Sequence, residues 1–115
     1  MSDVKIVQAL RELEYEPFKD DAQPDEIKGY NKYCVYYDHS LRKGDQKQFS
    51  KIIEFVFVNE SDGLFDEETI IPTLEKTGLL FEDGDFGRLK KSVGGDIVNS
   101  LTLRFARPRK RKCIY

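Results

Sequence analysis

The chain has 115 residues, of which 39% are hydrophobic and 35% are charged, and its formal net charge is −2. This length corresponds to one domain of ordinary size with a single small core. A net charge so close to zero excludes a general electrostatic attraction to nucleic acid. The longest apolar runs are only a few residues, too short for a signal peptide or a membrane span, so we expect a soluble protein in cytoplasm-like conditions.

Charge is distributed unevenly along the chain. Residues 12–26 carry seven acidic residues against one lysine, and residues 104–112 carry six basic residues and no acid. The basic run could bind phosphate groups, but no aromatic stacking platform alternates with it. We therefore favour an acidic protein surface as its partner, with a solvated run of no specific role and nucleic acid as the alternatives.

The first element predicted along the chain is an amphipathic helix over residues 2–15. Its apolar residues recur on one face of a 3.6-residue period, and these are Ile6, Val7, Leu10 and Leu13. Pro17 ends this pattern. The highly charged residues 16–29 are predicted to form a loop.

Two strands follow this loop. Residues 31–39 are apolar on both faces, so we expect a helix to cover one face and a partner to cover the other. Residues 40–48 are predicted as a polar hairpin loop. Residues 49–59 are rich in β-branched and aromatic side chains, which is typical of a central strand. Its two faces are predicted to carry Phe49, Ile53, Phe55 and Phe57 on one side and Ile52, Glu54, Val56 and Val58 on the other.

A second helix is predicted from its end signals. Asp66 is the expected N-cap, and two glutamates follow it in the first turn, where the helix dipole favours negative charge. Gly78 occupies the position expected for a C′ glycine. Pro72 lies inside this helix and removes one backbone hydrogen bond, so we expect a kink or a split there.

The rest of the chain is predicted to contain mostly loop and one strand. Residues 79–81 are a candidate short strand, and residues 82–95, with their acids and four glycines, are predicted to form a loop. Residues 96–107 alternate between apolar and polar side chains, as a half-buried strand does. Pro108 is expected to stop this strand.

The predicted fold class is α+β, with a mostly antiparallel sheet of about four strands and two helices packed on one face. Residues 1–107 would form this single domain. Residues 108–115 would form a flexible basic C-terminal tail.

No combination of residues favours catalysis, a cofactor or a metal. The single histidine, His39, follows a strand beside a polar loop and is interpreted as a surface residue. The acidic run at residues 82–87 is too short to supply the ligands of a calcium loop. Cys34 and Cys113 have neither metal-site spacing nor a disulfide framework, so both are expected to be free thiols. We therefore expect a protein that is not an enzyme.

The order of these segments resembles the tail terminator, or tail completion, proteins of long-tailed bacteriophages. The similar pieces are the helix containing residues 6–10, the strands at residues 33–37 and 53–58, the acidic-capped helix at residues 66–78 and the strand ending near Phe105. Together they cover most of the chain. Pro72 and the basic tail depart from the pattern.

The resemblance implies a structural subunit that forms a six-membered ring on the end of a tail tube. Such a ring stops tube polymerisation and joins the tail to the head connector, so the implied partners are further copies of the chain, the tail tube protein and the connector. The implied locations are the host bacterial cytoplasm during assembly and then the virion tail. Ring interfaces are heterologous and need two different patches on each subunit.

We expect the contact residues to lie in three charged segments. They are Arg42, Lys43, Asp45 and Lys47 in the hairpin loop, Glu82, Asp83 and Asp85 in the acidic loop, and Arg107, Arg109, Lys110 and Arg111 in the basic tail. Two other classes of function remain open. One is a small nucleic-acid-binding regulator that uses the basic tail, and the other is a phage-encoded inhibitor of a host protein.

Overall fold

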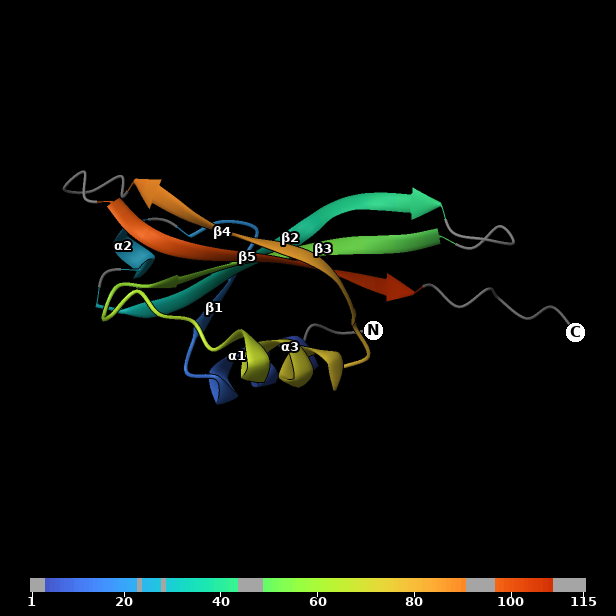
Figure 1. Ribbon diagram of the computed structural model, residues 1–115, viewed down its shortest axis with the longest axis horizontal. Coiled ribbons are helices and arrows are strands. Elements are labelled where there is room, and N and C mark those ends of the chain that lie inside the picture. The colour runs from blue at the N-terminus through green and yellow to red at the C-terminus, as the bar shows by residue number, and fades with distance from the viewer. Residues whose placement is uncertain (1–3, 23, 28, 44–48, 91–96, 109–115) are drawn as a thin grey trace, which may run out of the picture.

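The computed structural model describes residues 4–22, 24–27, 29–43, 49–90 and 97–108. They form one five-stranded sheet in the order β1-β2-β3-β5-β4, with helices beside it (Figure 1). The elements are α1 (Val4–Glu12), β1 (Glu16–Lys19), α2 (Pro24–Ile27), β2 (Lys32–Lys43), β3 (Phe49–Asn59), α3 (Glu67–Glu75), β4 (Leu80–Lys90) and β5 (Ile97–Pro108). The predicted α+β class is confirmed. The sheet is mixed, because β1 pairs with β2 in parallel while the other three pairings are antiparallel.

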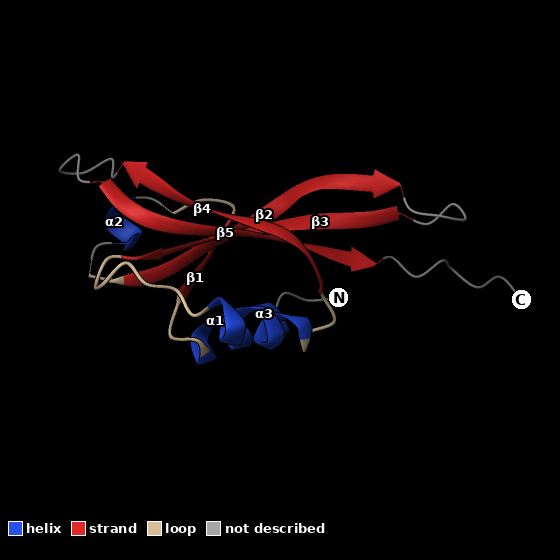
Figure 2. Ribbon diagram, viewed as in Figure 1, coloured by secondary structure: helices blue, strands red, loops and turns tan. Residues whose placement is uncertain are grey.

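The core lies between the sheet and the two longer helices. Helices α1 and α3 lie side by side on one face of the sheet, which we call the covered face (Figure 2). The helices bury Ile6, Leu10, Ile70 and Leu74 against it, as the predicted helical periodicity requires. Aromatic side chains fill the layer between them. Phe55 stacks on Tyr36 and Phe57 and meets Phe105 edge to face, with ring centroids 5.5 Å apart in the last pair.

Strand β3 has the predicted bounds, and from residue 52 to residue 58 its side chains lie on the predicted faces. Ile53, Phe55 and Phe57 point into the core, and Ile52 and Val58 are buried on the opposite face, which we call the open face. Because β3 lies between β2 and β5, neighbouring strands satisfy its main chain along both edges.

The prediction of a loop at residues 82–95 is wrong for its first part, because β4 extends to Lys90. Strand β4 pairs antiparallel with β5 from Leu80 to Lys90, with a bulge between Phe81 and Asp83. Glycine and aspartate are disfavoured in strands, so the local sequence carries no strand signal. Pairing with the long strand β5 stabilises β4 although its residues do not favour a strand.

The loop predicted at residues 16–29 is also wrong in part. It contains β1, whose four residues pair in parallel with β2, and the four-residue helix α2. Strand β1 is short and contains Pro17, and both features weaken the alternating pattern by which a strand is recognised in a sequence. Its Phe18 ring packs edge to face against Tyr30 and Tyr33, so this end of the open face is aromatic.

Helix α3 continues through Pro72 as one helix, so the expected split does not occur. Asp66 is at the N-cap position as predicted, but its carboxylate accepts a hydrogen bond from the Thr69 hydroxyl at 2.7 Å instead of capping a backbone N–H. One turn later, the Thr73 hydroxyl donates to the Thr69 carbonyl. Gly78 adopts a φ of 102°, two residues after the C-cap Lys76, and turns the chain towards β4.

The sheet is longer than the helices that cover it. Strand β2 has 12 residues and α3 has 9, which correspond to about 40 Å of strand and about 14 Å of helix. The ends of β2 and β5 and the start of β3 therefore extend beyond the helical layer, at the right of Figure 1. We call this region, residues 40–43, 49–52 and 106–108, the ribbon end. Within the described part of the chain, no helix is long and apolar enough to cross a membrane.

Candidate functional site

A charged cluster joins three strands on the open face. Arg104 on β5 lies opposite Glu54 on β3 and Asp83 on β4, so the register brings the three side chains together. The Arg104 Nε donates to Glu54 Oε1 at 2.9 Å. Its Nη1 donates to Asp83 Oδ1 at 3.0 Å and to Asp85 Oδ2 at 3.2 Å. One guanidinium thus connects the central strand to the edge strand.

Exposure within this cluster increases towards the edge of the sheet. The exposed fraction of the side chain is 9% for Glu54, 28% for Arg104, 62% for Asp83 and 72% for Asp85. Hydrogen bonds to Asp83 and Asp85 raise the pKa of Arg104, so the guanidinium remains charged. Three carboxylates share this one guanidinium, and His39 lies near Glu54, with 4.0 Å between Nε2 and Oε1. The cluster therefore presents excess negative charge at β4.

Strand β4 is an edge strand with an unusually open environment. Every residue from 80 to 89 is exposed, on both faces of the sheet. The exposed side chains include Leu80, Phe81, Phe86 and Leu89, and Ile97 is exposed on the neighbouring strand. Hydrophobic side chains that gather along an open edge are typical of an interaction surface.

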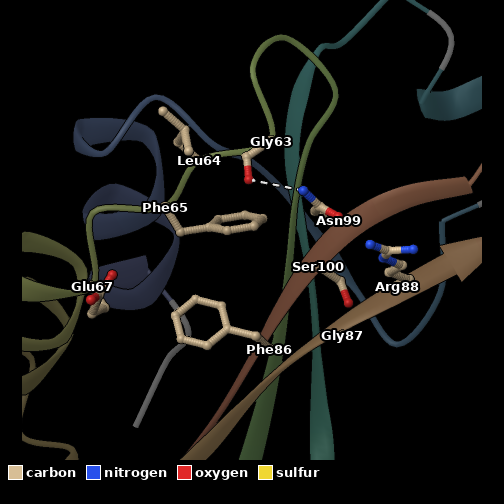
Figure 3. A pocket seen from close by; sticks show the side chains of 9 residues that line it. All are labelled: Gly63, Leu64, Phe65, Glu67, Phe86, Gly87, Arg88, Asn99 and Ser100. Atoms are coloured by element: carbon tan, nitrogen blue, oxygen red, sulfur yellow. Dashed lines mark hydrogen bonds between the residues drawn. The ribbon is translucent and has the colours of Figure 1, made fainter.

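A groove of about 410 Å³ lies beside this edge, between β4, β5 and the segment that leads into α3 (Figure 3). Phe65 and Phe86 both project into it from opposite sides. The Asn99 amide donates to the Gly63 carbonyl at 3.4 Å and closes one end. The remaining lining residues are Leu64, Glu67, Gly87, Arg88 and Ser100. This groove and the β4 edge together form what we call the edge surface.

A second cavity, of about 610 Å³, lies beside Tyr15. Lys32 Nζ is 4.8 Å from the centroid of the Tyr15 ring, and burial raises the pKa of the Tyr15 phenol to about 12. Two polar side chains at this cavity, Asn59 and Asp62, stabilise the local backbone. Asp62 accepts hydrogen bonds from the Asn59 amide and from the backbone N–H of Leu64, which fixes the turn after β3.

The structure brings some of the predicted contact residues together. Asp83 and Asp85 are joined by Arg104, and Glu82 lies at the β4 bulge, so these acids belong to a strand and not to a loop. Arg42 and Lys43 belong to the end of β2 and not to a hairpin loop. Asp45, Lys47, Arg109, Lys110 and Arg111 lie outside the described residues.

Two predicted segments that are far apart in sequence meet at the ribbon end. Strand β3 pairs with β2 on one side and with β5 on the other, so Leu41, Lys51 and Arg107 occupy one row across the three strands. Arg42 and Lys43 occupy the following rows. Lys51 also lies 3.6 Å from Asp38, between Nζ and Oδ2. Arg107 near the end of β5 is therefore adjacent to basic positions of β2 and β3.

Sequence reasoning missed the roles of Glu54, Arg104 and the groove residues. The alternation of β3 places Glu54 among apolar residues on one face, and an acid in such a position calls for a partner. That signal was available, but the identity of the partner depends on the order of strands in the sheet. Comparison with protein-family models and with curated proteins gave no match for this chain.

Proposed function

We propose that this protein is a structural subunit that assembles into a ring, of the tail-terminator type that its sequence resembles. In this role the ring caps a tail tube, stops its polymerisation and joins it to the head connector. The observation that carries the proposal is the exposure of β4, an 11-residue edge strand open on both faces and lined by hydrophobic side chains. A surface of this kind offers a template on which another protein chain can pair.

The two sheet edges are unequal, so a ring would have to join β4 to a surface other than β1. One edge is β4, and the other is β1, which has only four residues and contains Pro17. A closed ring needs two different patches on each subunit, whereas a two-fold dimer uses the same patch twice. Strand β4 offers a long edge for pairing, and β1 does not.

The ribbon end supplies a second, chemically different surface. It lies beyond the helices and carries basic positions on all three of its strands, at Arg42, Lys51 and Arg107. The edge surface carries excess acid. Opposite charges on separate regions of one subunit favour head-to-tail contacts between copies and disfavour contacts between like surfaces.

Native mass is the first test of this proposal. Light scattering after size exclusion, over a wide range of protein concentration, should show a shift towards about six subunits. Replacing the exposed Phe86 with Glu should keep the chain monomeric, because it places a charge in the edge groove. The matched control is Val4→Glu, an equally drastic change at an exposed position on α1.

A tube template extends the test to the biological role. If the ring forms only on a tube, the wild-type chain alone remains a monomer but shortens tubes when added to polymerising tail tube protein. The Phe86→Glu chain would leave tube length unchanged. A wild-type chain that neither assembles alone nor alters tube length would rule out the terminator role.

Nucleic acid binding is the second candidate function, because the basic positions of β2, β3 and β5 converge at the ribbon end. Four to six phosphate contacts would make binding to duplex DNA fall steeply with salt, by roughly 10²-fold or more between 50 and 200 mM. Fluorescence anisotropy with a labelled duplex measures this directly. A weak, shallow response would leave assembly as the better explanation of the basic surface.

A further inference from the structure

We propose that residues 109–115 of one copy bind the β4 edge of a second copy as an added parallel strand. This inference rests on the proposed function in one respect, since both require contact between copies. It names the segment that fills the edge surface.

The main chain of β4 has one edge that faces away from β5. This strand pairs with β5 on one side, and none of the strands in the described part of the chain pairs with its other side. Its outward N–H and C=O groups can therefore pair with an incoming strand, as in other peptide complexes formed by strand addition. The exposed residues 80–89 provide a site long enough for seven added residues, which span about 23 Å when extended.

The charges and apolar side chains of residues 109–115 can be compared with those along the β4 edge. From residue 82 to 88, β4 first carries Glu82, Asp83 and Asp85 and then Phe86, Gly87 and Arg88. Residues 109–112 are all basic, and Cys113, Ile114 and Tyr115 follow them. A parallel alignment with Arg109 opposite Glu82 places the basic half beside the acids and the apolar half beside Phe86, Gly87 and Arg88. An antiparallel alignment would instead bring the basic half towards Arg88.

The groove beside Phe86 offers space for a side chain of the added strand. In the parallel alignment Cys113 lies opposite Phe86, and Tyr115 lies two residues further along on the same face. That face holds the groove of about 410 Å³ between Phe65 and Phe86, which is large enough for an aromatic side chain (Figure 3). Aromatic residues that enter such pockets commonly dominate the binding energy of an interface.

The donor is a second copy because the same chain cannot reach this register. Strand β5 ends at Pro108, and β4 separates it from the outer edge. The outer position lies two strand spacings away, about 10 Å, and the chain would also have to reverse direction after β5. Such a turn uses several residues, so Arg109 could not lie beside Glu82. A neighbouring copy has no such restriction.

A cross-linking experiment with two kinds of chain tests the proposal. The acceptor carries Phe86→Cys and Cys113→Ser, and the donor has the wild-type sequence with a mass tag. Cys34 is fully buried and does not compete. Mild oxidation should give a covalent acceptor–donor dimer. The control acceptor, with Val4→Cys and Cys113→Ser, should give roughly tenfold less dimer, because its thiol lies away from the edge. Equal yields from both acceptors would overturn the proposal.

A peptide with the sequence of residues 109–115, with Ser at 113, provides an independent test. In excess, it should suppress the cross-link. A peptide with its basic and apolar halves exchanged should need at least about tenfold more for the same effect, because its charges then face Arg88. The acceptor with Asp83→Asn and Asp85→Asn should lose this preference. Equal competition by both peptides would contradict the parallel register.

The outcomes separate this inference from the ring proposal. Rings that form without the cross-link would retain ring assembly and exclude residues 109–115 as the added strand. A cross-link in a chain that never exceeds a dimer, alone or on a tube, would retain the added strand and exclude the ring.

Discussion

Strands β3 and β4 have the same length, eleven residues each, but opposite environments. In β3, residues 52–59 are buried apart from the partly exposed Val56, on both faces of the sheet. In β4, every residue from 80 to 89 is exposed. A strand buried on both faces stabilises its own subunit. An equally long strand exposed on both faces contributes little to that stability and leaves its surface for another chain.

The two strands are nevertheless connected through Arg104. Its guanidinium bonds the buried Glu54 of β3 and the exposed Asp83 and Asp85 of β4. The same residue therefore makes one bond sheltered from water and two bonds in contact with it. Changes at the two strands should separate folding effects from assembly effects.

The largest expected difference is between matched phenylalanines. Phe55→Ala in β3 should lower the free energy of unfolding by about 3–5 kcal/mol, because it empties the centre of the core. Phe86→Ala in β4 should change it by less than about 0.5 kcal/mol, because that ring is 69% exposed. Denaturant unfolding of monomeric protein measures both. Similar losses would show that β4 is part of the folding core.

The next effect concerns the guanidinium that bridges the strands. Arg104→Leu should cost about 1–3 kcal/mol, because it leaves the sheltered Glu54 carboxylate without its hydrogen-bond donor. Replacing both Glu54 and Arg104 with Leu should cost less than the single change. The Asp83→Asn and Asp85→Asn pair should cost less than about 0.5 kcal/mol, since those bonds are solvent-exposed. A larger cost for the aspartates than for Arg104 would reverse this interpretation.

Two glycines of β4 test how closely the edge strand packs on β5. A Cβ at Gly84 would lie 2.6 Å from Leu103 Cδ2 and 2.8 Å from the Thr102 carbonyl oxygen. Gly84→Ala should therefore cost about 1–3 kcal/mol through forced displacement. At Gly87 the nearest atom, Ser100 Oγ, is 3.4 Å away, so Gly87→Ala should change stability by less than about 1 kcal/mol. Thermal unfolding of the two variants provides the comparison.

The smallest expected effect is a loss of stability at alkaline pH, caused by Tyr15 in the core. Tyr15 packs edge to face on Phe57 of β3, with centroids 5.0 Å apart, and burial raises its pKa to about 12. The unfolded chain releases this proton near pH 10, so the stabilisation is complete below pH 10 and is lost as pH rises through 12. The expected loss at pH 11 is about 1.4 kcal/mol.

Tyr15→Phe is the control for this titration. It removes the phenolic proton and keeps the ring, so its stability should fall less between pH 9 and 11. Burial also raises the pKa of Cys34, whose contribution has the same sign and persists in the control. A wild-type chain and a Tyr15→Phe chain with the same pH dependence would contradict the assigned role of Tyr15.

The difference between β3 and β4 also explains which elements could be predicted. β3 was predicted with its bounds because its dense β-branched and aromatic residues indicate a strand without further context. β4 was predicted only at its start, within the candidate strand at residues 79–81, because the rest of this exposed edge strand has no buried face and hence no hydrophobic alternation. β1 was missed for a related reason: four residues with one proline make too short a pattern.

The candidate site was predictable only in pieces. The sequence identifies the acids at residues 82–85 and the basic positions at residues 42, 43 and 107 as candidate contact groups. Their arrangement depends on which strands are neighbours. β5 lies between β3 and β4, which brings Arg104 to Glu54 and Asp83, and β3 lies between β2 and β5, which aligns Leu41 with Arg107.

The sequence by itself determined the α+β class, the central strands, the two longer helices and the segments that carry charge. These features follow from short-range periodicity and from end signals that each segment contains within itself. Only the tertiary structure decided the edge strand, the Arg104 cluster, the groove beside Phe86 and the basic ribbon end. Each of these depends on pairing between residues that are distant in the chain. The stabilisation comes from those distant neighbours, which a local sequence pattern does not reveal.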